Sequence, residues 1–279
     1  MRSARTRMNK NFDLAVQLER YGEAIEREPR LYAGRWASAC YPLPESAHGG
    51  AYSEVRIDLG CGKGTFTVEM ARRNPDVLFI GIETEPLCIA YGARKALEQG
   101  VRNAVFVPSR DDAMEFFGPG ELSAIYLNFS TPFARKRDSR RRLTYFDRLM
   151  AYRELLAPGG IVRLKTDSFP LRDYTLTQFG EAGYQLLWVS DDVRRDYPDD
   201  PQTEYEERLV AEGALVYGCA ATPGPAPADA TRPESADRSL TDFLPDDPFA
   251  LDYVPLGMER YVQNMRNVAR KRGQAPESA

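Results

Sequence analysis

The chain has 279 residues and a formal net charge of −4, with 37 basic and 41 acidic side chains. The length suits one large domain with extensions or two small ones, and 43% hydrophobic residues suffice for a buried core. No apolar run approaches the length of a membrane span, and the charged start of the sequence lacks the apolar stretch of a secretory signal. The single histidine, His48, disfavours Ser-His-Asp chemistry and histidine metal sites, so we expect no metal. The four cysteines show no CxxC spacing, which favours reduced thiols in a cytoplasmic protein.

Strand-like apolar runs alternate with helical periodicity through most of the chain. The expected strands are 55–59, 77–82, 104–107, 122–127, 161–166, 184–189 and 214–219. The expected helices are 65–73, 85–99, 112–117, 144–156 and 171–182. This alternation predicts an α/β fold with a parallel sheet covered by helices on both faces. Ligands of such sheets bind beyond the carboxyl ends of the strands.

Composition divides the chain into three parts. Residues 1–50 form a basic arm and lead-in, residues 51–220 the α/β domain, and residues 221–279 a Pro/Ala-rich linker and a tail of unassigned role. We expect a disordered linker from Ala220 to about Asp237 and a short helix at Tyr261–Arg270. Charge is also unevenly spread, because Arg135–Arg142 holds six basic residues against one acid. The acidic total therefore does not exclude a nucleic-acid partner.

The strongest local signal is Ile57–Phe66, which reads I-D-L-G-C-G-K-G-T-F. An acid, Asp58, ends the strand, and glycines follow at positions 60, 62 and 64. Glycine lets the backbone turn tightly and approach a ligand closely. The G-x-G-x-G spacing from Gly60 differs from both the dinucleotide fingerprint and the P-loop. A plain tight turn between strand and helix is the alternative interpretation.

Two further acids follow the next two expected strands. Glu83 lies about 20 residues beyond the glycine loop, where an acid can hold ribose hydroxyls. Asp112 follows the third strand and suits an adenine amino group; Asp111 competes for this role, and a helix N-cap is the alternative for either. Together with Asp58 and the glycine loop they predict an adenosine site without a phosphate binder. That chemistry fits S-adenosylmethionine.

The fourth strand leads into Y-L-N-F-S-T-P-F-A-R-K-R-D-S-R-R-R-L at Tyr126–Leu143. This segment resembles the hallmark N-F-[PS]-D-P-W-P-K-x-R-H-x-K-R-R-L of the bacterial tRNA (guanine-N7)-methyltransferase family. The resemblance covers roughly residues 1–220, and nothing beyond Ala220 is similar to the family core. The other family-like segments are Tyr32–Trp36 (Y-x-G-x-W), the glycine loop near Leu59, Phe79–Glu83 (F-I-G-I-E), Leu155–Gly160 (L-L-A-P-G-G), Lys165–Asp167 (K-T-D) and Thr203–Glu206 (T-E-Y-E).

The resemblance implies a Rossmann-like class I methyltransferase fold, a three-layer αβα sandwich with a seven-stranded, mostly parallel sheet. It implies transfer of a methyl group from S-adenosylmethionine to N7 of guanine 46 in the tRNA variable loop, by a cytoplasmic monomer or homodimer that needs no metal and no membrane. Asp58, Gly60, Glu83 and Asp112 match the family's cofactor contacts. Arg135, Asp167, Thr203, Glu204, Tyr205 and Glu206 match its tRNA contacts.

Some of the tRNA contacts also have structural interpretations. Thr203 and Glu206 have the spacing of a capping box that opens a helix. Asp167 suits a turn after its strand, and Arg135–Arg142 suits a solvated face.

This sequence departs from the hallmark at Thr131, where the family has aspartate, as well as at Phe133 and Asp138, where it has tryptophan and histidine. Guanine N7 carries a lone pair, so attack on the methyl group needs no general base, and positioning suffices. If the family aspartate binds guanine N–H donors, a threonine there costs about 1–3 kcal/mol of recognition. We therefore place Thr131 at the catalytic position. A non-catalytic RNA-binding relative and a small-molecule methyltransferase are the alternatives; the cofactor acids argue against the first and the arginine cluster against the second.

Overall fold

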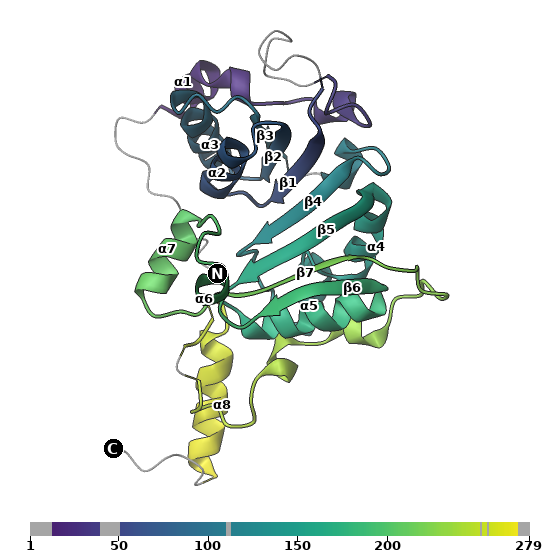
Figure 1. The fold of residues 1–279 in the computed structure, drawn as a ribbon. Coiled ribbons are helices and arrows are strands. Elements are labelled where there is room, and N and C mark those ends of the chain that lie inside the picture. Colours follow the sequence, from purple (N-terminus) through teal and green to yellow (C-terminus); the bar gives the residue numbers. More distant parts are fainter. Residues whose placement is uncertain (1–12, 40–50, 110–112, 252, 256, 273–279) are drawn as a thin grey trace. The chain divides into compact units, whose positions relative to one another are not determined.

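The computed structural model describes residues 13–39, 51–109, 113–251, 253–255 and 257–272. Seven strands of these residues form a sheet with the order β3-β2-β1-β4-β5-β7-β6 (Figure 1). The strands are β1 (Glu54–Leu59), β2 (Val77–Glu83), β3 (Ala104–Pro108), β4 (Leu122–Asn128), β5 (Leu156–Thr166), β6 (Tyr184–Ser190) and β7 (Tyr217–Pro223). The α-helices are α1 (Leu14–Arg20), α2 (Thr65–Arg73), α3 (Pro86–Glu98), α4 (Phe146–Leu155), α5 (Phe169–Glu181), α6 (Val193–Asp196), α7 (Glu204–Ala211) and α8 (Glu259–Lys271). The predicted seven-stranded α/β fold of the class I methyltransferases is confirmed.

The chain divides into two compact units. The first comprises the residues up to Asn128 together with 154–161 and 201–204, and the second comprises 129–153, 162–200 and 205 onward. In the first unit β1 pairs in parallel with β2 and β4, and β2 pairs in parallel with β3. In the second unit β7 runs antiparallel to both β5 and β6. The sheet is therefore mixed at this end.

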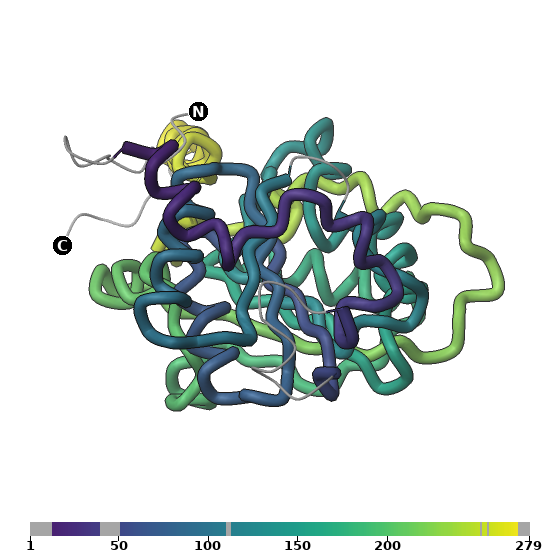
Figure 2. Tube along the Cα trace, turned by 90° about the horizontal axis from the view of Figure 1, so that it is seen from above, coloured from purple at the N-terminus to yellow at the C-terminus, as the bar shows by residue number. Residues whose placement is uncertain are grey.

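The core of the first unit forms where α2 and α3 bury their apolar sides. Phe66, Phe79 and Phe106 are fully buried in one cluster with alanines of both helices. The strand β2 is buried on both faces, as its unbroken apolar sequence predicts. The residues that precede the sheet join this core: Ile25 pairs with Phe106 at the edge of β3, in the purple part of the trace (Figure 2). The lead-in is thus part of the first unit.

The Y-x-G-x-W motif in this lead-in has a structural role. Trp36 is fully buried, stacks on Tyr32 and donates from Nε1 to the carbonyl of Phe116 at 2.8 Å. The carboxylate of Glu121 accepts from the backbone N–H groups of Gly34 and Trp36. These bonds fasten the segment to the loop before β4.

Several predicted boundaries are wrong. The strand β5 begins at Leu156, directly after α4, and not at residue 161. It includes Gly160, where a Cβ would lie 2.9 Å from the carbonyl oxygen of Ala157, so the strand passes too close for a side chain. The segment at 112–117 contains a 3₁₀ helix, η4 (Ala113–Phe116), and β7 spans Tyr217–Pro223 where 214–219 was expected.

The predicted disordered linker from Ala220 to Asp237 is wrong at its two ends. Its first residues belong to β7, and the 3₁₀ helix η6 (Glu234–Asp237) ends it. Ala236 is fully buried. Composition misled here because Pro and Ala can pack against an existing surface without periodicity of their own. The predicted helix near the C-terminus is confirmed as α8.

Candidate active site

The glycine loop joins β1 to α2 in the first unit. Gly60, Gly62 and Gly64 have φ angles of 82°, 54° and 69°, which residues with a Cβ rarely adopt. A Cβ on Gly64 would also lie 2.5 Å from the ring of Phe106, so this glycine permits close packing of helix and sheet. A Cβ on Gly60 or Gly62 would meet nothing within 4 Å. Those two glycines therefore leave space open above the end of β1.

Backbone hydrogen bonds hold this loop against β2. The N–H groups of Gly60 and Cys61 both donate to the carbonyl of Ile82, at 2.8 and 3.1 Å. The N–H of Gly62 donates to Oε2 of Glu83 at 3.1 Å, and the N–H groups of Thr84 and Glu85 donate to its Oε1. The Glu83 carboxylate is thus fixed at the end of β2, beside the loop.

Asp58 lies beneath the loop. It is only 1% exposed, and its carboxylate accepts from Thr67 Oγ1 at 2.6 Å and from Asn128 Nδ2 at 3.1 Å. These bonds connect β1, α2 and β4, so Asp58 supports the shape of the loop. Among the residues the structure describes, the buried Oδ1 of Asn128 has no hydrogen-bond partner. A donor on a bound ligand would satisfy this acceptor.

The glycine loop also contains a cysteine, Cys61. Burial, aided by the charges of Asp58 and Glu83, raises the pKa of the Cys61 thiol well above its usual range, which keeps the thiol protonated. Asp112, the predicted adenine contact, lies outside the described residues.

Glu204, at the start of α7, binds the glycine loop's lysine. Its carboxylate accepts from Lys63 Nζ at 3.0 Å, Thr65 Oγ1 at 3.2 Å and Lys95 Nζ at 3.0 Å. Burial opposes ionisation, but the hydrogen bonds from the two lysines outweigh it and lower the pKa of Glu204. A residue predicted to contact tRNA thus fastens Thr203 and the start of α7 beside the loop. The helix begins where the T-x-x-E pattern predicts.

The second unit begins with the hallmark loop, by which we mean residues 129–142. Phe129 and Phe133 have φ angles of 51° and 48°, and they are the non-glycine residues with positive φ in the described chain. Each costs about 1–2 kcal/mol, and such strain is concentrated at functional sites. Thr131 lies between them and is exposed. The loop is held in an unfavourable conformation that presents Thr131 to solvent.

Arg142 is what holds this loop. Its guanidinium is buried, donates to the carbonyls of Pro132 and Phe133 and lies 4.3 Å above the ring of Tyr174. Burial lowers its pKa, although arginine remains charged. The predicted basic run therefore has two parts. Arg142 is structural, whereas Arg135, Lys136, Arg137, Arg140 and Arg141 are exposed on or beside the 3₁₀ helix η5 (Lys136–Arg141).

The K-T-D and T-E-Y-E segments meet in a buried ion network of the second unit. Lys165 is fully buried and donates to Asp200 and Glu206, each at 2.8 Å. Arg194 Nε forms an ion pair with Glu206 at 2.9 Å without hydrogen-bond alignment, and Arg163 pairs with Asp200 at 2.6 Å. Desolvation lowers the pKa of Lys165 although both acids oppose the shift. Glu206 has no exposed surface, so a tRNA contact from it stays a prediction.

Asp167 and Tyr205 lie closer to the surface. Asp167 is 7% exposed and accepts a hydrogen bond from Tyr253 Oη at 2.7 Å. The ring of Tyr205 packs edge-on against Phe129 at 5.5 Å, and burial raises its pKa to about 12. Tyr205 thereby supports the strained hallmark loop from α7.

Sequence reasoning missed several of these residues. Asn128 is the first residue of the hallmark motif, so the motif itself was the available signal. Arg142 was hidden inside a basic run in which every residue suggested solvent exposure. Nothing in the sequence indicates a role for Tyr253, because its hydrogen-bond partner Asp167 is 86 positions away in the chain.

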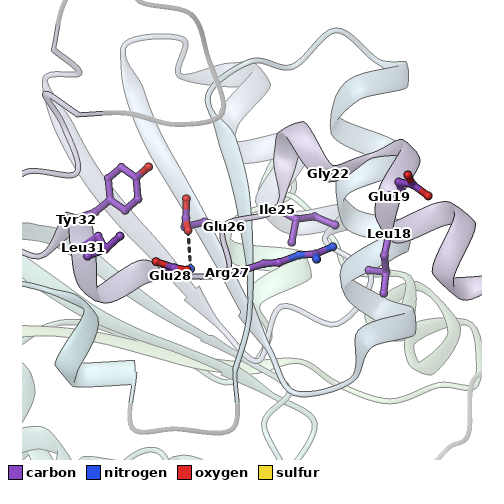
Figure 3. A pocket seen from close by; sticks show the side chains of 9 residues that line it. All are labelled: Leu18, Glu19, Gly22, Ile25, Glu26, Arg27, Glu28, Leu31 and Tyr32. Atoms are coloured by element: carbon purple, nitrogen blue, oxygen red, sulfur yellow. Dashed lines mark hydrogen bonds between the residues drawn. The ribbon is translucent and has the colours of Figure 1, made fainter.

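A separate pocket of about 510 Å³ lies in the first unit beside α1 (Figure 3). It is lined by nine residues between Leu18 and Tyr32, and Glu26 Oε1 accepts there from the N–H of Glu28 at 2.6 Å. None of the predicted site residues lines it.

Within the described residues, no helix is both long and apolar enough to cross a membrane.

Residues 53–219 match the family described as "Putative methyltransferase". This defines the class of protein to which the fold and the glycine loop belong: an enzyme that transfers methyl groups. The chain is 36% identical over 207 residues to the tRNA (guanine-N(7)-)-methyltransferase of Geobacillus kaustophilus, which covers 74% of this chain and 91% of the relative. It is 32% identical to that of Streptococcus equi subsp. zooepidemicus over 77% and 99% of the two chains, and 35% identical to that of Bacillus subtilis over 68% and 85%. The chain belongs to the tRNA (guanine-N7)-methyltransferase family.

Nothing in these comparisons favours the non-catalytic alternative. Among solved structures, the 16S rRNA methyltransferase KamB aligns with a TM-score of 0.48 and 14% identity, over 62% of this chain and 89% of that one. This likeness is too weak to bear on the substrate.

Proposed function

We propose that this protein methylates N7 of guanine 46 in the variable loop of tRNA, with S-adenosylmethionine as the methyl donor. The observation that carries the proposal is the similarity to enzymes of that name over 74% of this chain, joined to a glycine loop whose open side adjoins a fixed carboxylate. The reaction takes place in the cytoplasm, where tRNA resides.

The first unit suits an adenosine ligand on three counts. Gly60 and Gly62 leave space that any side chain would fill. Glu83 presents a carboxylate held by three backbone N–H groups, which suits ribose hydroxyls. The unpartnered Oδ1 of Asn128 suits a cationic donor such as an amino group. When bound, S-adenosylmethionine supplies an electrophilic methyl group on a sulfonium.

The reaction requires little acid–base chemistry from the protein. A new N7–C bond forms as the S–C bond breaks, the lone pair of N7 supplies the electrons, and the positive charge passes from sulfur to the guanine ring. No proton leaves N7, so the reaction does not depend on a histidine base or an activated cysteine. The residues of this chain contribute in-line positioning and negative charge near the developing cation.

The second unit supplies the guanine and phosphate contacts in this proposal. N7 faces the deep major groove of A-form RNA, so the target base must lie in an irregular region or be extruded. The exposed Thr131 accepts from the base edge, and Phe133 stacks on the ring. Arg135 and the exposed part of the basic run bind phosphates, which orient the tRNA. Asp167, Tyr205 and Glu206 are further proposed substrate contacts of this unit. Thr203 and Glu204, which belong to the first unit, are proposed substrate contacts as well, Glu204 through the lysine of the glycine loop.

The test is incubation of the full chain with unmodified tRNA transcript and labelled S-adenosylmethionine, followed by digestion and identification of the methylated base. We expect N7-methylguanine, and none from a transcript with adenine at position 46. Glu83→Gln is expected to raise KM for S-adenosylmethionine about tenfold or more while tRNA affinity is unchanged. Tight tRNA binding without any methylated product at saturating donor would overturn the proposal.

A further inference from the structure

The residues that follow β7 cover a face of the second unit. We call the described residues from 224 to 272 the C-terminal extension; the family match ends at Cys219. Leu240 and Met258 are fully buried in one apolar cluster with Ala134, Leu171 and Tyr174. The extension is therefore a packed part of this unit (Figures 1 and 2, yellow-green to yellow).

Polar contacts fasten the same segment to the hallmark loop. Asp237 Oδ1 accepts from Ser139 Oγ and Tyr145 Oη, both at 2.9 Å. The N–H of Leu240 donates to the carbonyl of Ala134 at 2.9 Å, and Arg142 Nη1 donates to the carbonyl of Arg238 at 2.8 Å. The extension thus packs on both ends of the segment that carries the basic run.

Two tyrosines of the extension contact predicted tRNA-binding residues directly. Arg135 Nε donates to Tyr261 Oη at 2.7 Å, and Tyr253 Oη donates to Asp167. Tyr261 belongs to α8, so α8 adjoins the exposed basic run. A surface on α8 is consequently continuous with the proposed tRNA site of this unit.

The helix α8 is apolar on one side and basic on the other. Met258, Val262 and Ala269 are buried with helical spacing, and Arg266 is tied to the carbonyls of Pro248 and Leu251 at 3.0 Å. The outer side carries exposed cations and amides, namely Arg260, Gln263, Asn264, Asn267, Arg270, Lys271 and Arg272. Glu259 is the one acid between residues 259 and 272.

We propose that this outer side of α8 binds the phosphate backbone of tRNA, as an extension of the substrate surface that is peculiar to this chain relative to the family match. The inference rests on the proposed function. Exposed arginine and lysine with neighbouring amide donors are the groups that bind phosphates. An anionic membrane is the other polyanion to consider, but membrane-bound amphipathic helices insert their apolar face, and here that face is buried in the protein core.

The experiment compares two variants of the full chain that lose the same charge. The α8 variant carries Arg260→Gln, Arg270→Gln, Lys271→Gln and Arg272→Gln. The control carries Arg20→Gln, Arg72→Gln, Arg94→Gln and Arg102→Gln, which are exposed arginines of the first unit. Affinity for unmodified tRNA transcript is measured at several salt concentrations, alongside KM for S-adenosylmethionine, the melting temperature and binding to vesicles containing phosphatidylserine.

We expect the α8 variant to bind tRNA on the order of tenfold more weakly at ~0.1 M salt, with a log–log salt slope lower by about 2 to 4. KM for S-adenosylmethionine and the melting temperature should match those of the wild type, and the control should bind tRNA nearly as the wild type does. Equal losses in both variants, no loss in either, or a loss confined to vesicle binding would overturn the inference. Failure of the wild-type chain to form N7-methylguanine would overturn the proposed function instead, so the two failures are distinguishable.

Discussion

The two units hold their functional groups by different means. In the first unit the backbone holds the site: glycines in left-handed conformations shape the loop, and backbone N–H groups fix the carboxylate of Glu83. In the second, side chains hold the backbone: Arg142 restrains the strained hallmark loop, and Lys165 joins β5 to α7 through Glu206. A backbone-built site can be recognised in a short motif, whereas a site built on side chains depends on residues far apart in sequence.

The largest expected effect tests the buried ions of the second unit. Lys165 and Arg194 each pair with both Asp200 and Glu206. Lys165→Met removes the more deeply buried of these two cations, and the free energy of unfolding should fall by about 3–5 kcal/mol in urea titrations. Arg94→Met is the matched control, because it removes an exposed ion pair with Glu98 and should leave the free energy of unfolding nearly unchanged. A loss below about 1 kcal/mol for Lys165→Met would contradict the structural role given to this network.

The next effect tests the backbone-built site. Gly64→Ala combines an unfavourable φ with a clash against Phe106, so we expect a loss of about 2–3 kcal/mol in unfolding free energy. In Gly60→Ala the added methyl group contacts no other atom, so the free energy of unfolding should fall by only about 1 kcal/mol. The same methyl group should, however, weaken the binding of S-adenosylmethionine. Thermal unfolding and donor titrations measure both quantities. Equal destabilisation by the two substitutions would show that packing does not distinguish these glycines.

A smaller effect is expected at the position where this chain departs from its family. Thr131→Asp restores a bidentate acceptor, so kcat/KM for tRNA should be preserved or rise by up to about tenfold. Thr131→Asn serves as the control, because asparagine has the shape of aspartate without its charge. A loss of about 100-fold or more in the aspartate variant would mean that the strained loop is adapted to threonine.

The smallest effect concerns Glu69 on α2. Hydrogen bonds from Arg72 and Arg73 lower its pKa to about 2, below the ordinary value of 4.5. The carboxylate therefore stabilises the fold above about pH 4.5, and this contribution is lost as the pH falls toward 2. Glu69→Gln should cost about 0.5–1 kcal/mol at pH 7, as is usual for pairs on a helix surface. The free energies of unfolding of the wild type and of Glu69→Gln are compared at pH 7 and at pH 3. A difference between the two proteins that is larger at pH 3 would contradict the stabilising role given to the Glu69 carboxylate.

The sequence predicted the sheet and the cofactor side of the site better than the substrate side. The strand β2 was identifiable because its residues 77–82 are all apolar, and the glycine loop because its residues are contiguous. The end of the linker was mispredicted because its buried Ala236 has no local pattern. The burial of Glu206 and Arg142 could not be predicted from the sequence either, because charged side chains are buried only when other elements of the fold supply their partners.

By itself, the sequence determined the α/β architecture, the glycine loop and membership of a methyltransferase family, since periodicity and short motifs depend on neighbouring residues. Only the tertiary structure decided which charges are structural. It separated Arg142 from the exposed arginines beside it, joined Lys165 to acids 35 and 41 positions away, and packed the C-terminal extension against the hallmark loop. The physical reason is that a charge leaves water only where distant parts of the chain together supply its partners.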